Sequence, residues 1–182
     1  MSPSLLLDLV NSRLVLDDAV SDELGDDGAA SAWLRAHGLS GTSGEITDAR
    51  AVRAALVPFL RGETDAAALA PWVRAMRKRA EAQPGGLVWI DEIDPARAIG
   101  ASVIEEWSGL QGEQGSRIRP CAAADCQHFL IDESRANSRK WHSMETCGNR
   151  AKARRHYARS KLGEVPAEPA GEPSSTVSPP LP

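Results

Sequence analysis

The chain has 182 residues, 42% of them hydrophobic, and a formal net charge of −4. It contains no run of about 20 uninterrupted apolar residues, so we expect no transmembrane helix and no membrane partner. The opening stretch MSPSLLLDLVNSR lacks a basic segment, which argues against a secretory signal peptide and for a cytoplasmic protein.

The charge is unevenly distributed along the chain. Residues 1–116 include 10 basic and 18 acidic residues, whereas residues 117–161 include 11 basic and 4 acidic residues. Residues 162–182 contain three glutamates and no basic residue. A basic segment in an otherwise acidic chain indicates an anionic partner for that segment.

The first predicted elements are short. LLLDLVN fits either a short strand or the start of a helix, because its periodicity does not decide between them. The acidic stretch DDAVSDELGDD is expected to form a loop, and SAWLRAHG predicts a short helix that ends at Gly38.

Two longer helices are predicted next. The first would begin after an N-cap at Thr47 and end at Gly62. Its buried face would comprise Val52, Leu56, Phe59 and Leu60. The second would run from Thr64 toward Gln83, unless Pro71 begins a new helix. Its buried face would comprise Leu69, Trp72, Val73, Met76 and Ala80.

A strand and one further helix are predicted before the basic segment. Pro84-Gly85-Gly86 would end the preceding helix, and LVWID has the alternating pattern of a strand. Asp94 followed by Pro95 predicts the N-cap and first residue of a helix that stops near Gly109. That helix would bury Ile99, Val103, Ile104 and Trp107.

These patterns predict an α+β fold in three parts. Residues 1–112 would form a helix-dominated domain with few short strands, and residues 117–161 a small zinc-finger module with a basic helix. Residues 162–182, rich in Pro, Gly, Ser and Glu, are predicted to be disordered. The first part has no Gly-rich phosphate loop and no nucleophile elbow, so we do not expect an enzyme.

The metal-binding prediction rests on the spacing of cysteines and histidines. Cys121, Cys126, His142 and Cys147 are spaced C-x4-C-x15-H-x4-C. Zinc binds four nitrogen or sulfur ligands in a tetrahedron, and four protein ligands leave no open position, so the site would be structural. An odd number of cysteines also favours metal ligation over disulfides. His128 and His156 are alternative fourth ligands, but His142 places four residues inside each ligand pair.

The same segment resembles a known family. The pattern C-x4-C…F-x-x-x-x-S…R-x-W-x-S-M-x-x-C-G-N-R-x-K, from Cys121 to Lys152, is similar to the CGNR zinc-finger family of bacteria. In that family the finger follows a domain called ABATE, described as a stress-induced transcription regulator, and LDLVNSR is similar to its opening. The family usually shows W-C-S-M, so His142 implies a site of three cysteines and one histidine.

A basic helix is predicted directly after the last cysteine. The stretch from Asn149 to Gly163 contains no helix breaker, and its cations point to several sides of the helix. The predicted nucleic-acid contacts are Arg150, Lys152, Arg154, Arg155 and Arg159. Docking of this helix on the acidic N-terminal domain and a merely solvated helix are the alternatives.

The leading hypothesis is a DNA-binding bacterial transcription regulator with a structural zinc finger and a basic helix. The residues themselves indicate zinc and polyanion binding, and the resemblance supplies the role in transcription. The N-terminal domain would then form homo-oligomers or sense an unidentified small-molecule ligand. The alternatives are a protein-interaction adaptor that binds an acidic partner and an RNA-binding module.

Overall fold

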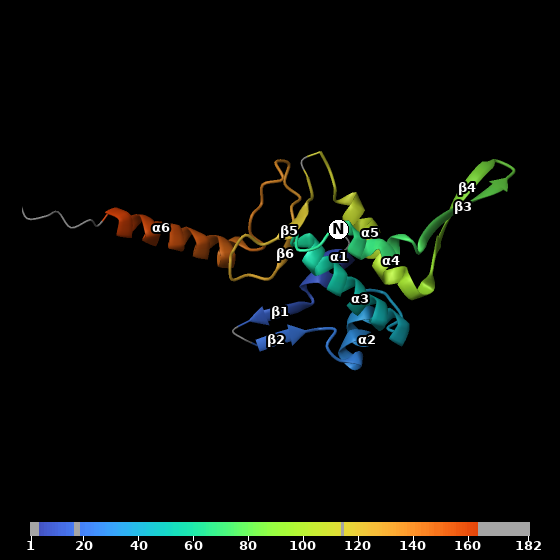
Figure 1. Cartoon of the computed structure of the whole chain (residues 1–182), viewed down its shortest axis with the longest axis horizontal. Helices are drawn as coiled ribbons and strands as arrows, with labels where there is room; N and C mark the ends of the chain where they lie inside the picture. Colours follow the sequence, from blue (N-terminus) through green and yellow to red (C-terminus); the bar gives the residue numbers. More distant parts are fainter. Residues whose placement is uncertain (1–3, 17–18, 114, 164–182) are drawn as a thin grey trace, which may run out of the picture.

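Helices are the main secondary structure of the molecule, and the computed structural model describes residues 4–16, 19–113 and 115–163 (Figure 1). Short antiparallel strand pairs complete the predicted α+β fold: β1–β2, β3–β4 and β5–β6. In chain order the elements, with η marking a short helical turn, are α1 (Leu5–Asn11), β1 (Arg13–Leu16), β2 (Ala19–Asp22), α2 (Asp27–Ala36), α3 (Ser43–Leu60), η1 (Ala66–Leu69), α4 (Ala70–Val73), β3 (Met76–Gln83), β4 (Gly86–Ile93), η2 (Pro95–Arg97), α5 (Ala98–Gly109), β5 (Ile118–Pro120), β6 (Phe129–Ile131), η3 (Met144–Gly148) and α6 (Asn149–Gly163).

One hydrophobic core joins the N-terminal helices to the start of the basic segment. Leu6 of α1, Val52 of α3 and Val103 of α5 are fully buried in it. Ile118 of β5 and Phe129 of β6 are each 2% exposed and belong to the same core. The predicted division between residues 112 and 117 therefore falls within one continuous core.

Residues 5–11 form helix α1, which settles the choice between strand and helix. Ser4 is its N-cap, and the Ser4 hydroxyl accepts a hydrogen bond from the Leu7 amide at 3.0 Å. Glu106 of α5 accepts hydrogen bonds from the Ser4 hydroxyl and from the Leu6 amide. A carboxylate at a helix N-terminus satisfies amides that have no partner within the helix.

The stretch predicted as an acidic loop contains a strand. Residues 19–22 form β2, which pairs with β1 from Arg13↔Asp22 to Leu16↔Ala19, while Asp17 and Asp18 lie outside the described residues. Arg53 of α3 donates two hydrogen bonds to Asp22, at 2.6 and 2.9 Å. Burial tends to raise the pKa of the Asp22 carboxyl, but these bonds outweigh it and hold the pKa below its usual value.

The helix predicted from Thr64 to Gln83 is wrong: only residues 66–73 are helical, as η1 and α4, and Val73, predicted to be buried, is 52% exposed. Residues 76–83 form strand β3, which pairs along its whole length with β4 through a two-residue turn at Pro84-Gly85. MRKRAEAQ consists mainly of good helix formers, but pairing with the β-prone LVWI segment overrides that local preference. Figure 1 shows this hairpin projecting from the body of the molecule.

A buried carboxylate fixes the contact between α3, α4 and α5. Asp48 is 2% exposed and accepts hydrogen bonds from Trp72 Nε1 at 2.6 Å and from the Gly100 amide at 2.9 Å. A Cβ at Gly100 would lie 2.0 Å from the Trp72 ring, so only glycine allows this approach. Trp72 is therefore a core residue, as expected, with a polar partner that its periodicity did not reveal.

Two other predicted boundaries of the N-terminal helices are confirmed, whereas α3 starts earlier than predicted, at Ser43. Helix α2 ends just before Gly38, which has a positive φ of 79°, and Asp94 caps η2 at the start of α5. Within the described residues, no helix has the length and apolar composition needed to cross a membrane. Helix α6 runs to Gly163, and the predicted disorder at 164–182 lies outside the described residues.

Candidate metal centre and basic helix

The four predicted ligands come from two segments that backbone hydrogen bonds hold together. Cys121 directly follows β5, and its amide donates to the His128 carbonyl at 2.8 Å, which extends the β5–β6 ladder. Cys126 lies in the loop of that hairpin. The second segment is attached where the Ala122 amide donates to the Lys140 carbonyl at 2.8 Å, close to His142.

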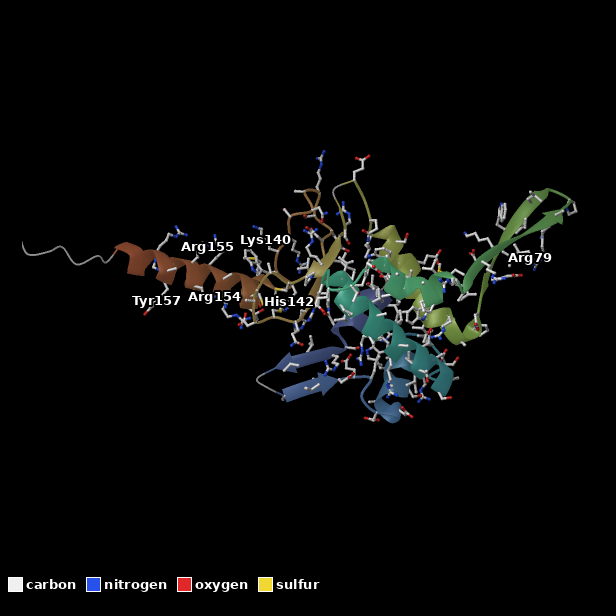
Figure 2. All side chains as sticks on the ribbon, viewed as in Figure 1. Arg79, Lys140, His142, Arg154, Arg155 and Tyr157 are labelled. Carbon is white, nitrogen blue, oxygen red and sulfur yellow. The ribbon has the colours of Figure 1, made fainter. Side chains whose placement is uncertain are left out.

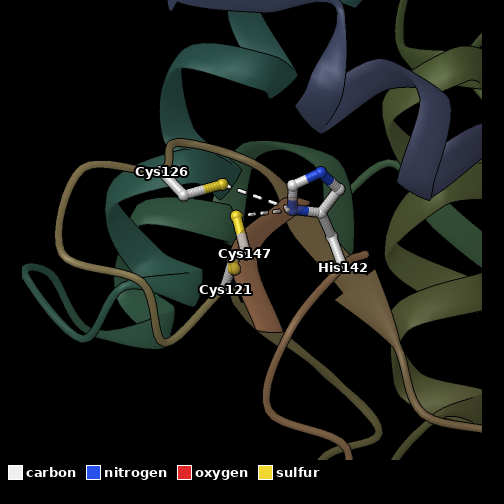
Figure 3. Close-up of side chains that lie close together, drawn as sticks. All are labelled: Cys121, Cys126, His142 and Cys147. Atoms are coloured by element: carbon white, nitrogen blue, oxygen red, sulfur yellow. Dashed lines mark hydrogen bonds between the residues drawn. The ribbon is translucent and has the colours of Figure 1, made fainter. Parts of the chain in front are cut away.

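The ligand atoms of Cys121, Cys126, His142 and Cys147 converge on one point (Figure 3). All four atoms lie within 4.8 Å of one another. His142 Nδ1 is 3.3 Å from Cys126 Sγ and 3.6 Å from Cys147 Sγ. A tetrahedral zinc ion, with Zn–S near 2.3 Å and Zn–N near 2.0–2.1 Å, separates its sulfur and nitrogen ligands by about 3.6 Å. The donor set and its spacing therefore fit one zinc ion.

His142, and not His128 or His156, occupies the position of the fourth ligand. The His128 ring stacks on the His142 ring at 4.1 Å between centroids and 7° between planes. His128 Nδ1 lies 3.6 Å from Cys126 Sγ, but His128 is not one of the four converging residues. His156 lies on the exposed surface of α6. The preference for His142, based on symmetric spacing, agrees with this geometry.

The surroundings of the site favour the protonation state that a histidine ligand needs. Burial first, and then the charges of Arg139 and Arg150, lower the pKa of His142. A neutral imidazole is the form that binds a metal ion. Among the thiols, burial raises the pKa of Cys126 to about 12. A bound cation would stabilise the cysteine thiolates against that cost of burial.

The residues that follow the third cysteine explain the Cys-Gly-Asn-Arg sequence at 147–150. Cys147 is 1% exposed and lies in the turn η3, which leads directly into α6. A Cβ at Gly148 would lie 2.6 Å from Met144 Sδ, so a larger residue there would require the Met144 side chain to move. Arg150 then donates from Nη2 to Cys147 Sγ at 3.5 Å, which adds a positive charge beside a thiolate ligand.

Two aspartates that the sequence analysis did not single out organise the finger. Asp132 is completely buried and accepts hydrogen bonds from the amides of Ser134 and Arg139, so it holds the loop that precedes His142. Hydrogen bonding by Ser134 is the main cause that lowers the pKa of Asp132. Asp125, between the first two ligands, pairs with Arg150 at 3.2 Å and Arg154 at 3.5 Å.

The finger is attached to the N-terminal helices by side-chain and backbone bonds. The Asn11 side chain at the end of α1 accepts from the Phe129 amide at 2.8 Å and donates to the Phe129 carbonyl at 3.3 Å. Arg61 lies over the Phe129 ring, with its guanidinium carbon 5.6 Å from the ring centroid. Phe129 belongs to the main core, whereas Trp141 packs against the cysteine cluster.

The structure divides the predicted nucleic-acid contacts between two sides of α6. Arg150 and Arg154, one turn apart, both face Asp125. Lys152, Arg155 and Arg159 instead line one shallow surface together with Ala153 and His156. Residues three, four and seven positions apart share one face of a helix. Figure 2 shows α6 extending away from the body, with Arg154, Arg155 and Tyr157 along it.

Comparison with known protein families agrees with this geometry. Residues 117–160 match the model of the CGNR zinc finger family. The matched segment contains all four ligands and most of α6. No curated protein matches the chain. The finger of this protein is thus similar to CGNR zinc fingers, and its three cysteines and one histidine are positioned to bind one metal ion, consistent with zinc.

Proposed function

We propose that this protein is a cytoplasmic DNA-binding transcription regulator of bacterial type, in which a structural zinc site positions α6 for contact with duplex DNA. The observation that carries the proposal is the exposed cationic surface formed by Lys152, Arg155 and Arg159 on α6. Each of these residues is exposed, and among the described residues none of them takes part in an ion pair.

The dimensions of this cationic surface suit the phosphates that flank a DNA groove. Lys152 and Arg159 lie seven residues apart, which is about 10 Å along a helix. The major groove of B-DNA, about 12 Å wide, admits one α-helix. Lysine and arginine side chains on the helix would then reach phosphates and displace bound counterions.

Asp125 pairs with the other two predicted contacts, Arg150 and Arg154, and so holds them away from the phosphate-contacting surface. Its ion pairs with Arg150 and Arg154 tie the first turns of α6 to the metal-binding loop. These pairs lie within the finger, whereas docking of α6 on the acidic N-terminal domain would require partners from that domain. We infer that Arg150 and Arg154 orient the helix and that Lys152, Arg155 and Arg159 contact phosphate.

The test compares DNA binding of the zinc-loaded chain with that of a variant in which Lys152, Arg155 and Arg159 are all replaced by alanine. Binding to a random-sequence duplex pool is measured by fluorescence anisotropy between about 50 and 200 mM salt. Loss of three phosphate contacts should reduce the slope of log K against log salt by about 2.7. Sequencing of the bound duplexes would reveal whether one sequence is enriched.

The matched control removes the same charge from exposed positions of the N-terminal part, by replacing Arg35, Arg74 and Arg77 with alanine. The control should keep the slope of the unchanged protein, and both variants should keep one zinc ion per chain. Equal slopes for all three proteins would show that this surface of α6 does not contact DNA. If the unchanged protein does not bind DNA but binds polyglutamate, it acts as a protein-interaction adaptor. Tighter binding to structured RNA than to DNA would indicate an RNA-binding module.

A further inference from the structure

The β3–β4 hairpin is an exposed arm whose strands pair only with each other among the described residues. Leu87 and Trp89 are each 64% exposed, and Val88 is 42% exposed. Figure 1 shows the arm at one end of the long axis of the molecule and α6 at the other. An isolated two-stranded hairpin is marginally stable in water, and a cluster of exposed apolar side chains marks an interaction site.

Most of the exposed apolar residues of the arm lie on one of its faces. Directly opposed residues of an antiparallel pair point to the same face, and the observed register pairs Ala80 with Trp89 and Ala82 with Leu87. These four residues are hereafter the arm face. Val88 is the neighbour of Trp89 along β4, so its side chain points to the opposite face.

We propose that the arm face binds the arm face of a second copy of this chain and forms a homodimer. The arm face has a ridge on β4, made by Leu87 and Trp89, beside a shallow trough on β3, made by two alanines. A two-fold axis parallel to the strands places β4 of each copy over β3 of the other. Trp89 then covers Ala80 of the second copy, and Leu87 covers Ala82 of the second copy.

The charges next to the arm face are complementary in the same arrangement. Lys78 and Asp91 are cross-strand partners on this face, pair at 3.2 Å and have side chains that are 66% and 60% exposed. The two-fold axis places Lys78 of each copy opposite Asp91 of the other. Asp91 would repel a polyanionic partner, and Lys78 would repel a polycationic one. A second copy of the chain instead places an opposite charge beside each of these residues.

The size of the arm indicates a weak dimer. Eight-residue strands span about 26 Å, and the arm face occupies roughly the outer half of that length. The contact is therefore smaller than the roughly 800 Å² per partner of a standard stable interface. We expect a dimer that exchanges rapidly and dissociates on dilution.

The first test is sedimentation velocity of the zinc-loaded full chain over a wide concentration range. The unchanged protein should sediment faster as its concentration rises, and Trp89→Ser should weaken the association by at least about tenfold. Val88→Ser is the matched control, because it removes an exposed apolar side chain from the same strand but from the other face. A monomer at all concentrations, or equal effects of the two variants, would overturn the proposal.

A second test distinguishes the loss of a contact from a hairpin that no longer folds. In the proposed dimer, position 78 of each copy faces position 91 of the other. Lys78→Glu makes both positions acidic and Asp91→Lys makes both basic, so like charges would face each other and each variant alone should be monomeric. An equimolar mixture should form a heterodimer, because both carboxylates of the first variant then face the two ammonium groups of the second. Failure of the mixture to associate would contradict the proposed arrangement.

Discussion

His142 is the residue whose identity most affects the metal centre. Its Nδ1 lies between two cysteine sulfurs, and the stacked His128 ring covers one side of the imidazole. The Arg139 side chain bonds the carbonyls of Trp141 and His142, at 3.0 and 2.5 Å, which fixes the backbone that carries the ligand. Such neighbours orient a ligand without touching the metal.

We predict that replacing these two histidines has unequal effects on zinc affinity. His142→Ala removes a ligand and should weaken binding by more than about 100-fold, whereas His128→Ala should cost no more than the roughly 10–100-fold typical of a residue that orients a ligand. Competition with a chromophoric chelator at fixed pH measures both affinities. His142→Cys should retain the zinc, since thiolate is an equally suitable ligand. A larger loss for His128→Ala than for His142→Ala would show that the ligand is misassigned.

The sequence was sufficient to identify the ligands but not the residues that support them. Cysteines and histidines at regular short spacing are rare enough to predict zinc directly from Cys121, Cys126, His142 and Cys147. Asp132 and Asp125 have no comparable signal, because an aspartate in a polar loop looks like a surface residue. Their roles depend on amides and guanidinium groups that only the folded chain brings together.

Helix α3 shows how a helix boundary can be mistaken when two threonines compete for the N-cap. The helix was predicted to start after Thr47 but begins at Ser43, with Thr42 as N-cap. The Glu45 amide donates to the Thr42 hydroxyl at 3.3 Å, and the Glu45 carboxylate accepts from the Thr42 amide at 2.8 Å. This reciprocal pair is a capping box, and Thr47 lies one turn inside the helix, where its hydroxyl bonds the Ser43 carbonyl.

We therefore predict that replacing the two threonines by alanine changes the free energy of unfolding by different amounts. Thr42→Ala removes the cap and should lower the free energy of unfolding by about 1 kcal/mol. Thr47→Ala is the control: its side chain is exposed and alanine is the better helix former, so the free energy should stay within about 0.5 kcal/mol. Urea unfolding monitored by circular dichroism measures both. A larger loss for Thr47→Ala would support the later start of the helix.

Strand β3 could not be predicted from its own residues. MRKRAEAQ has neither the alternation nor the β-branched residues of a strand, and its charges suited an exposed helix. It becomes a strand because Pro84-Gly85 turns the chain back and LVWI supplies a β-prone partner. Pairing between segments is a non-local property, so the correct prediction of a strand at LVWID did not extend to its neighbour.

At the scale of the whole molecule, the zinc finger divides into two parts with different supports. Its hairpin, β5–β6, is anchored in the main core by Ile118 and Phe129 and bonded to Asn11. Its second part, from His142 through α6, is attached by the metal ligands and by Asp125. Helix α6 has 15 residues, of which 152–160 are exposed, and a helix of that length is marginally stable in water by itself.

Removal of zinc should therefore unfold only one of these parts. After chelation, the amides of α6 should exchange rapidly with deuterium, because Cys147 no longer fixes the turn that begins the helix. The amides of β5, β6 and α3 should stay protected, since their core does not include the metal. Hydrogen exchange measured by mass spectrometry, before and after chelation, resolves these segments.

Cys147→Ala provides an independent version of the same experiment, because it removes one ligand without adding a chelator. It should reproduce the rapid exchange of α6 and abolish DNA binding while β5 and β6 remain protected. Loss of protection throughout 117–161 would show that the finger folds as one unit that depends on zinc. Unchanged protection of α6 would show that its ion pairs with Asp125 are sufficient to hold the helix, and that zinc does not control the DNA-contacting surface.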